Sequence, residues 1–518
     1  MTIQNTNILK IKTLLTKLSL LGVQVSPEVF ELLYKRDDIT KMLEEKVINY
    51  LLITKEKPAI LTLEILYSLL KTETCENETT DASHMPDEIE IIFEPTEYIL
   101  SKSLSIDFKN YFMSRYTKLR KILLTERFDT KGFIDIYDIA SYKNYSIHQE
   151  RNTVKIICIV SDKLISKNHI LFEVEDLTGE ISVIVTKKNE NLIRRARNIL
   201  PNEVICIEGF ITDEGKIIAT DILQPEVTQP SINIGKKPDL YALLISDLHI
   251  GSKYFMRTEF NRLILWLNGF LGDEKMKRLA RKVKYLVVAG DVVDGIGIYP
   301  NQEEELVIKD LKKQYDIAAH YFSQIPQHIK IFLIPGNHDA ARQTLPSTKL
   351  YKEYAASLYR LNNVIILGDP VYFKLHDSLF LVTHGRSLDD IIVSIPELKY
   401  EAPAKAMVEL LKRRHLAPVY GNRTLIAPEE EDYMVIEKIP HVFHAGHIHT
   451  FECIYYKGIV VVNSGTWQRQ TEHMKKMGIQ PNPAKAVLIN LGNNTVQAII
   501  NFIEENVKEE KSEGHEGL

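Results

Sequence analysis

Side chains that bind metal ions recur in the second half of the chain, and each group directly follows a short apolar run. The groups are Asp247-Leu248-His249, Gly290-Asp291-Val292-Val293-Asp294, Gly336-Asn337-His338-Asp339, His384-Gly385-Arg386 and Gly446-His447-Ile448-His449. Asp, Asn and His without Cys form a hard-to-borderline donor set, suited to manganese, iron, zinc or magnesium. The sequence therefore predicts a metal site built from oxygen and nitrogen ligands.

The apolar runs before these groups are typical of buried β-strands. They cover residues 241–246, 285–289, 329–334, 379–383 and 441–445. Ligand sites in open α/β sheets lie at the carboxyl ends of the strands, where loops on a rigid sheet can converge. One such motif alone indicates little, because Asp and His are common on protein surfaces. Five in order predict one shared site.

The amino-acid composition changes along the chain before these motifs and divides it into several segments. Residues 1–71 carry apolar residues at helical spacing, with stop and start signals at Gly22 and Ser26-Pro27. They predict a helical N-terminal domain, whose apolar stripe is a bundle core or a partner-docking face. Residues 72–100 predict an acidic linker, but the apolar residues Ile89, Ile91, Ile92 and Phe93 leave open that its second half packs against another element. Residues 101–149 predict a helical connector, and a snorkelling surface helix is favoured there over a nucleic-acid contact.

Residues 150–224 contain five short β-rich runs, with a helix-like stretch after the third. That order is typical of an OB-fold, a small barrel often used for single-stranded nucleic acid. Because Phe172 and Phe210 are the aromatic residues within these runs, a structural or partner-binding role is favoured over base stacking. We expect a linker at 225–239, an α/β domain at 240–503 and a frayed acidic tail at 504–518.

Bulk composition narrows the class of protein. Apolar residues make up 45% and charged residues 26% of the chain, as in ordinary globular proteins. The net charge of −5 excludes a strong basic excess, so any DNA-binding potential must be concentrated. Basic runs at 275–284 and 412–414 are candidates, or else solvated helix faces. Scattered cysteines predict no zinc ribbon, and no apolar run reaches the ~20 residues of a membrane span, so we expect a cytoplasmic protein without a membrane partner.

The five motifs in this order resemble the calcineurin-like metallophosphoesterase superfamily over residues 240 to 500. The resemblance implies an α/β sandwich of two packed sheets flanked by helices. It also implies two divalent ions about 3.5–4 Å apart, manganese foremost, that activate a water nucleophile and clamp the phosphate. One ion would be held by Asp247, His249, Asp291 and His449. The other would be held by Asp291, Asn337, His384 and His447, with the Asp291 carboxylate bridging.

Three further residues receive catalytic roles from this resemblance. His338 is left free to protonate the leaving oxygen, a task suited to imidazole near neutral pH. Asp339 is expected to orient His338. Arg386 is expected either to contact a phosphate or to form a structural salt bridge. Asp294 is expected to support the site and not to bind a metal.

The stretches 290–305, 384–390 and 463–468 are similar to the small-subunit family of archaeal family D DNA polymerases. That resemblance implies a proofreading 3′–5′ exonuclease for single-stranded or mismatched DNA 3′ ends, nucleoid-associated in an archaeal cell. It implies a heterodimer with a large catalytic polymerase subunit and contact with a sliding clamp, although the sequence shows no convincing clamp-binding peptide. A catalytically silent structural B-subunit is one alternative, against which the complete ligand set argues. A repair nuclease or a phosphatase of the same superfamily is another.

Overall fold

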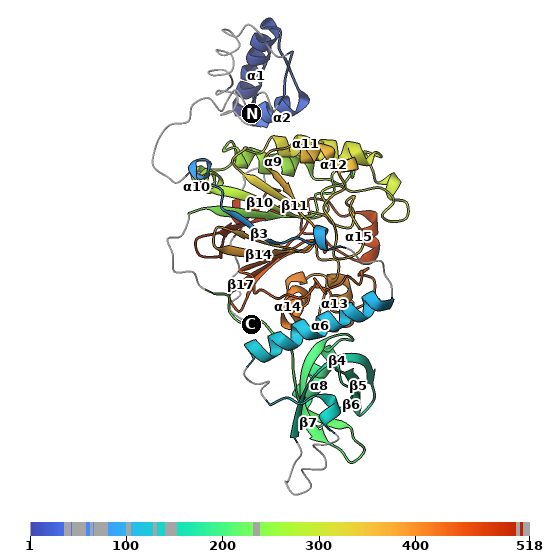
Figure 1. Cartoon of the computed structure of the whole chain (residues 1–518). Helices are drawn as coiled ribbons and strands as arrows, with labels where there is room; N and C mark the ends of the chain where they lie inside the picture. Colours follow the sequence, from blue (N-terminus) through green and yellow to red (C-terminus); the bar gives the residue numbers. More distant parts are fainter. Residues whose placement is uncertain are drawn as a thin grey trace.

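The computed structural model describes residues 2–35, 43, 59–62, 66, 81–99, 105–127, 132–139, 153–231, 239–503 and 508–510. It is a multidomain α/β protein with two large sheets and a closed five-stranded barrel (Figure 1). Residues 72–80 and 100 of the first predicted linker, 232–238 of the second and most of the acidic tail fall outside these residues. In the part of the chain that the structure describes, no helix is long and apolar enough to cross a membrane.

The N-terminal region contains helices α1 (Thr2–Leu20) and α2 (Pro27–Lys35) and a short parallel pair, β1 (Gln24–Val25) with β2 (Ile60–Leu61). Leu14 and Leu18 of α1 are buried against Leu33 of α2. Gly22, with φ of 79°, follows α1 where a left-handed residue ends the helix, as the sequence predicts. The apolar stripe is thus a core in the described part of this region.

Residues 89–93 of the predicted acidic linker are ordered, in line with the alternative that their apolar side chains left open. These residues form β3 (Ile89–Phe93), which pairs antiparallel with β13 (Val371–Leu375) at the edge of a large sheet. Ile92 and Phe93 pack on the sheet's hydrophobic core, and this apolar contact outweighs the acidic composition around them. Short 3-10 turns, η2 (Ala82–His84) and η3 (Pro95–Tyr98), flank the strand.

Helix α6 (Ser105–Glu126) connects two domains, and one of its faces is exposed, as expected of an amphipathic surface helix, but Arg115 on the other face does not snorkel to solvent. The helix lies between the barrel and the large α/β domain (Figure 1). Arg115 is fully buried, and its Nε lies 2.7 Å from Asp432 Oδ2. Tyr116 donates its hydroxyl hydrogen to the carbonyl of Ile157 in the barrel. The helix therefore joins two domains through buried polar contacts.

The barrel confirms the five predicted runs and the helix after the third. Its strands close in the order β4-β5-β6-β8-β7. Phe172 is buried in the barrel core, so its ring is not available to stack on a base. The elements are β4 (Thr153–Ile165), β5 (His169–Glu175), β6 (Glu180–Thr186), α8 (Glu190–Asn198), β7 (Val204–Ile211) and β8 (Ile217–Leu223).

A seven-stranded sheet has the order β12-β11-β10-β9-β18-β19-β20, and β9 to β12 run parallel. The tail residues 508–510 were expected to fray, but they pair with β19 at the edge of this sheet. The strands are β9 (Tyr241–Ile245), β10 (Val283–Ala289), β11 (Lys330–Ile334), β12 (Val364–Ile366), β18 (Lys485–Asn490), β19 (Thr495–Asn501) and β20 (Lys508–Glu510). Helices α9 (Arg257–Leu267), α10 (Glu274–Arg281), α11 (Leu311–Ser323) and α12 (Lys352–Tyr359) share the core on its outer face.

A six-stranded sheet has the order β16-β17-β15-β14-β13-β3 and packs against the first. Phe332 of one sheet stacks on Phe373 of the other, with ring centroids 4.6 Å apart. Its remaining strands are β14 (Ser378–Val382), β15 (Val442–Ala445), β16 (Phe451–Tyr456) and β17 (Ile459–Ser464), and α13 (Leu388–Ser394) and α14 (Pro403–Arg413) cover its outer face. Two packed sheets with helices outside place all five motif strands in one domain.

Candidate metal centre

The five motif strands deliver their side chains to one place. Asp247, Asp291 and Asn337 follow β9, β10 and β11 of the seven-stranded sheet. His384 and His447 follow β14 and β15 of the six-stranded sheet. Because these strands are parallel within each sheet, their carboxyl ends share an edge. The site therefore lies where the matching edges of two packed sheets meet.

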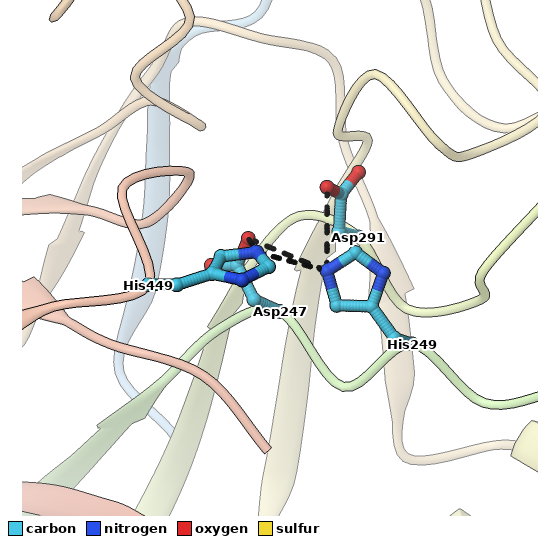
Figure 2. A group of neighbouring side chains, drawn as sticks. All are labelled: Asp247, His249, Asp291 and His449. Carbon is cyan, nitrogen blue, oxygen red and sulfur yellow. Dashed lines mark hydrogen bonds and ion pairs between the residues drawn. The ribbon is translucent and has the colours of Figure 1, made fainter. Parts of the chain in front are cut away.

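Four of the predicted ligands converge on one point (Figure 2): Asp247, His249, Asp291 and His449. His249 Nε2 lies 3.9 Å from Asp247 Oδ1 and 3.8 Å from Asp291 Oδ2. His449 Nε2 lies 3.2 Å from Asp247 Oδ1 and 3.0 Å from His249 Nε2. This is the complete ligand set expected for the first ion.

These spacings fit a shared cation. Ligand atoms about 2.1 Å from one ion lie roughly 3.0 Å apart at right angles and roughly 3.4 Å apart in a tetrahedron. The observed distances, from 3.0 to 3.9 Å, bracket those values. Two carboxylates and two imidazoles are also donors that suit a hard or borderline divalent ion. The residues present therefore fit a divalent metal.

The second predicted set is partly assembled. His384 Nε2 lies 3.3 Å from Asp291 Oδ2 and 3.0 Å from Asn337 Oδ1. The ring of His447 lies beside that of His384, with centroids 5.1 Å apart, but His447 Nε2 points to Asp389 Oδ2 at 3.0 Å. Three of the four residues thus share one point, and the fourth lies next to it.

The backbone around the site is strained. Asp247, His249, Asp291, His447 and His449 all have φ between 51° and 71°, a left-handed conformation that side chains with a Cβ rarely adopt. Such backbone strain is maintained only where the surrounding structure holds it in place, and it is found most often at functional sites. The turns that aim these side chains are therefore held by the fold and do not reflect local preference.

Glycines let these turns approach each other. A Cβ on Gly336 would overlap the Asp291 carboxylate, and a Cβ on Gly446 would overlap that of Asp247. Because both contacts are tighter than real Cβ atoms allow, glycine is required at both positions.

The electrostatic environment of the centre favours a bound cation. Burial alone would raise the pKa of Asp247 and Asp291, but neighbouring histidines lower both below their usual values. Burial opposes the charged form of His384, yet Asp291 raises its pKa to about 9. The same negative charge that favours a proton there favours a divalent ion, which would displace it.

Hydrogen bonds fix which nitrogen each histidine presents. His249 Nδ1 lies 3.0 Å from Asp294 Oδ1, and His384 Nδ1 lies 2.9 Å from the carbonyl of Ala289. Since both partners accept hydrogen bonds, Nδ1 carries the hydrogen and Nε2 is left to face the centre. Gln468 Nε2 also donates to Asp294 Oδ1. Asp294 thus supports the site, as expected.

The expectation that Asp339 orients His338 is wrong. The Asp339 carboxylate accepts hydrogen bonds from the backbone N–H groups of Val292 and Gly336 and from the Tyr315 hydroxyl. His338 Nδ1 instead lies 2.8 Å from the backbone carbonyl of Asp294. Asp339 ties two motif loops together, because a buried carboxylate needs several donors.

Among the described residues Arg386 forms no salt bridge, and it contacts backbone carbonyls instead. It is 8% exposed and donates to the backbone carbonyls of Gly336 and Gln343. It therefore holds the loop that carries Asn337 and His338. Its Nε donor has no hydrogen-bond partner in the described part of the chain, so the phosphate contact stays a prediction.

The 412–414 run proposed for DNA contact is structural, and so is Lys284 of the 275–284 run, whereas Lys275, Arg278 and Arg281 are exposed. Lys284 and Arg414 are buried, and they pair with Asp87 and Glu126 at 2.9 Å. Arg413 is buried against Glu203 of the barrel. Lys412 pairs with Glu409. These charges mainly join domains and cap helices.

Residues 463–468 support the site in a way that spacing alone did not predict. Asn463 donates to the carbonyl of Gly446, and the Thr466 hydroxyl donates to the carbonyl of Asp247. The N–H of Trp467 donates to the same Asp247 carbonyl. This turn therefore locks the first and fifth motif loops together. Its signal in the sequence was its place in a stretch similar to a known family.

A cleft of about 320 Å³ opens onto the centre. Its floor holds His249, Asp291, Asn337, His338 and His449. Its walls hold Ile298, Tyr299, Asp389, Tyr400, Arg423, Met474 and Ile479, the last two in or beside α15 (Glu472–Met477). The cleft thus combines a polar floor with partly apolar walls.

Comparison with known proteins defines the class first. Residues 242–453 match the family model that describes the B-subunits of DNA polymerases alpha and epsilon. Among solved structures, a chain of the S. pombe Stn1-ten1 complex aligns with 14% of this chain and 55% of its own length, at 20% identity and a TM-score of 0.13.

Relatives then define the family. The DNA polymerase II small subunit of Methanothermobacter thermautotrophicus is 38% identical over 478 residues, 91% of this chain and 96% of the relative. That of Archaeoglobus fulgidus is 40% identical over 391 residues, 76% of each chain. That of Pyrococcus furiosus is 40% identical over 398 residues, and this chain spans 63% of its length. The chain belongs to the family of archaeal DNA polymerase II small subunits.

Proposed function

We propose that this chain is the proofreading subunit of an archaeal replicative DNA polymerase, a 3′–5′ exonuclease with two divalent ions, manganese foremost. The observation that carries the proposal is the position of one oxygen. Asp291 Oδ2 lies 3.8 Å from His249 Nε2 and 3.3 Å from His384 Nε2, between the two ligand sets. A carboxylate oxygen shared in this way suits a bridging ligand between two ions.

The chain's own residues then have separate tasks. Asp247, His249, Asp291 and His449 would hold one ion, and Asp291, Asn337, His384 and His447 the other. Such ions supply an activated water nucleophile and neutralise charge on the phosphate. His338 Nε2 would donate its proton to the leaving oxygen. Burial lowers the pKa of His338, so the imidazolium form that carries this proton is a stronger acid but is less populated near neutral pH.

The domain plan supports the same proposal. The strand order of the barrel is the one expected of an OB-fold, and the packed sheets with outer helices suit a calcineurin-like phosphoesterase domain. We propose that these domains have the predicted boundaries, and that residues 81–99 belong to the phosphoesterase domain. The relatives' description as small subunits supports a larger catalytic partner. We also propose DNA 3′ ends as substrate and the sliding clamp as a further contact.

Digestion of primers labelled at the 3′ or the 5′ end, paired or mismatched, tests the proposal in manganese. We expect stepwise loss from the 3′ end, faster at a mismatch and abolished by His338→Ala. Cleavage by neither the chain nor its complex with the large subunit would favour a catalytically silent B-subunit. Internal cuts or 5′ digestion would favour a repair nuclease.

A further inference from the structure

One wall of the cleft is apolar although the floor is built for charge. Ile298 and Tyr299 lie on one segment, and Met474 and Ile479 belong to the α15 region. Ile298 keeps 38% of its surface exposed. Apolar side chains offer neither a ligand to a metal ion nor a hydrogen bond to a phosphate. The wall therefore indicates a flat or apolar part of the substrate.

Tyr299 is fixed beside the proposed acid. Its ring centroid lies 6.2 Å from that of His338, with 59° between the planes. Its hydroxyl donates to Glu305 Oε2 at 2.9 Å. Because the hydroxyl is held at the far end, the ring is positioned before a substrate arrives.

Gln302 fixes the segment that carries this ring. It is 1% exposed and lies in the turn η6 (Gln302–Glu304). Its Oε1 accepts from the N–H of Ile298, and its Nε2 donates to the carbonyl of Asp294. That carbonyl is the one that His338 Nδ1 contacts. One side chain thus links the aromatic wall to the support of the acid, so both move as a unit.

We infer that Tyr299 is a stacking platform for the base of the penultimate nucleotide at the DNA 3′ end. The inference rests on the proposed function. In that reaction water oxygen bonds to phosphorus, the P–O3′ bond breaks, and His338 gives its proton to O3′. The nucleoside that keeps this O3′ is the penultimate one, and it therefore lies on the His338 side of the phosphate. Stacking on an aromatic ring accepts any base.

Two substitutions separate the ring from its hydroxyl and its volume. Tyr299→Phe keeps the aromatic face, whereas Tyr299→Leu keeps an apolar side chain without that face. Tyr137→Ala is the control, because Tyr137 is a tyrosine 75% exposed near the barrel. All are made in the full chain carrying His338→Ala, so that bound DNA is not consumed. Thermal melting of each variant shows that it is folded.

The probe is a fluorescent thymidine tetranucleotide, intact or lacking the penultimate base, and anisotropy in manganese gives its Kd. Loss of that base should weaken binding by roughly tenfold with Tyr299 or Phe, as expected for one stacked base. The penalty should vanish with Leu and persist in the Tyr137→Ala control. An equal penalty in all variants, or none in the parent, would overturn the inference. Failure of the exonuclease proposal would show separately, as normal binding without cleavage when His338 is present.

Discussion

The Nδ1 atom of His338 lies 2.8 Å from the backbone carbonyl oxygen of Asp294. Because a carbonyl only accepts, Nδ1 carries a hydrogen and the other ring nitrogen, Nε2, is the one that can exchange a proton with a substrate. The same Asp294 binds His249 through its carboxylate. One residue thus orients both a proposed metal ligand and the proposed acid.

Removal of the acid should separate chemistry from metal binding. We expect His338→Ala to lower kcat on a primer by roughly 100- to 10,000-fold, the range for general acid–base groups. Metal content, measured by mass spectrometry, should not change, because His338 is in neither ligand set. His320→Ala, on the exposed side of α11, is the control. Loss of bound manganese in the His338 variant would contradict this role.

Weakening the hydrogen bond between His249 and Asp294 should lower the affinity for the metal. Asp294→Asn keeps the size of the side chain but cannot accept two hydrogen bonds at Oδ1 from His249 and Gln468 with the same strength. We expect manganese affinity, measured by calorimetry, to fall by roughly 10- to 100-fold, as for other residues that orient a metal ligand. Asp316→Asn on α11 is the matched control. Unchanged affinity would show that His249 needs no such partner.

The buried pair between Arg115 and Asp432 should hold the domains together. Arg115→Met leaves the buried Asp432 carboxylate with His415, whose Nε2 lies 2.8 Å from Asp432 Oδ2, and removal of one partner from a buried pair costs up to about 5 kcal/mol. Arg120→Met is the control, because the Arg120–Asp135 pair is partly exposed and pairs of that kind contribute about 1 kcal/mol or less. Urea unfolding gives both values. Equal, small losses would mean that α6 does not join the domains as described.

The same cluster predicts a pH dependence of stability. Burial, together with the charge of Arg115, lowers the pKa of His415 to about 4. Below pH 6.5 the unfolded chain takes up a proton at His415 that the folded chain refuses. The contribution of His415 to stability should therefore fall between pH 6.5 and pH 4, by up to about 3 kcal/mol, while Asp339, whose pKa burial raises to about 6, acts in the opposite direction. The lowered pKa of Asp432 acts only below this window.

Urea midpoints across this pH range, for the parent and for His415→Gln, check the prediction. The variant cannot take up a proton at this position. The slope of its unfolding free energy against pH should therefore be smaller by the contribution of about one proton. Parallel curves for the two proteins would contradict it.

Strand ends were the part of the site that the sequence could predict. Apolar runs before Asp247, Asp291 and His384 are long enough to be recognised, and parallel strands bring their ends to one edge. The glycines beside them indicate close turns. Side-chain direction could not be predicted, because it depends on contacts across the fold. The partner of His338 is the clearest case, since the adjacent Asp339 turns away to bind Val292 and Gly336.

Composition was misleading where long-range contacts decide the structure. Residues 89–93 lie in an acidic stretch, yet the nearly 280 residues that separate them from β13 do not prevent pairing with it. Arg115 and Arg413 were taken for surface charges because arginine is usually exposed. Both are buried by acidic partners on distant elements, Asp432 and Glu203, which no local pattern reveals.

The account depends most on two ion sites that share Asp291. Anomalous diffraction from crystals grown with manganese tests this directly. We expect two peaks about 3.5–4 Å apart, one among Asp247, His249 and His449 and one beside Asn337 and His384, with Asp291 between them. A single peak, or two that do not share Asp291, would contradict the two-metal centre.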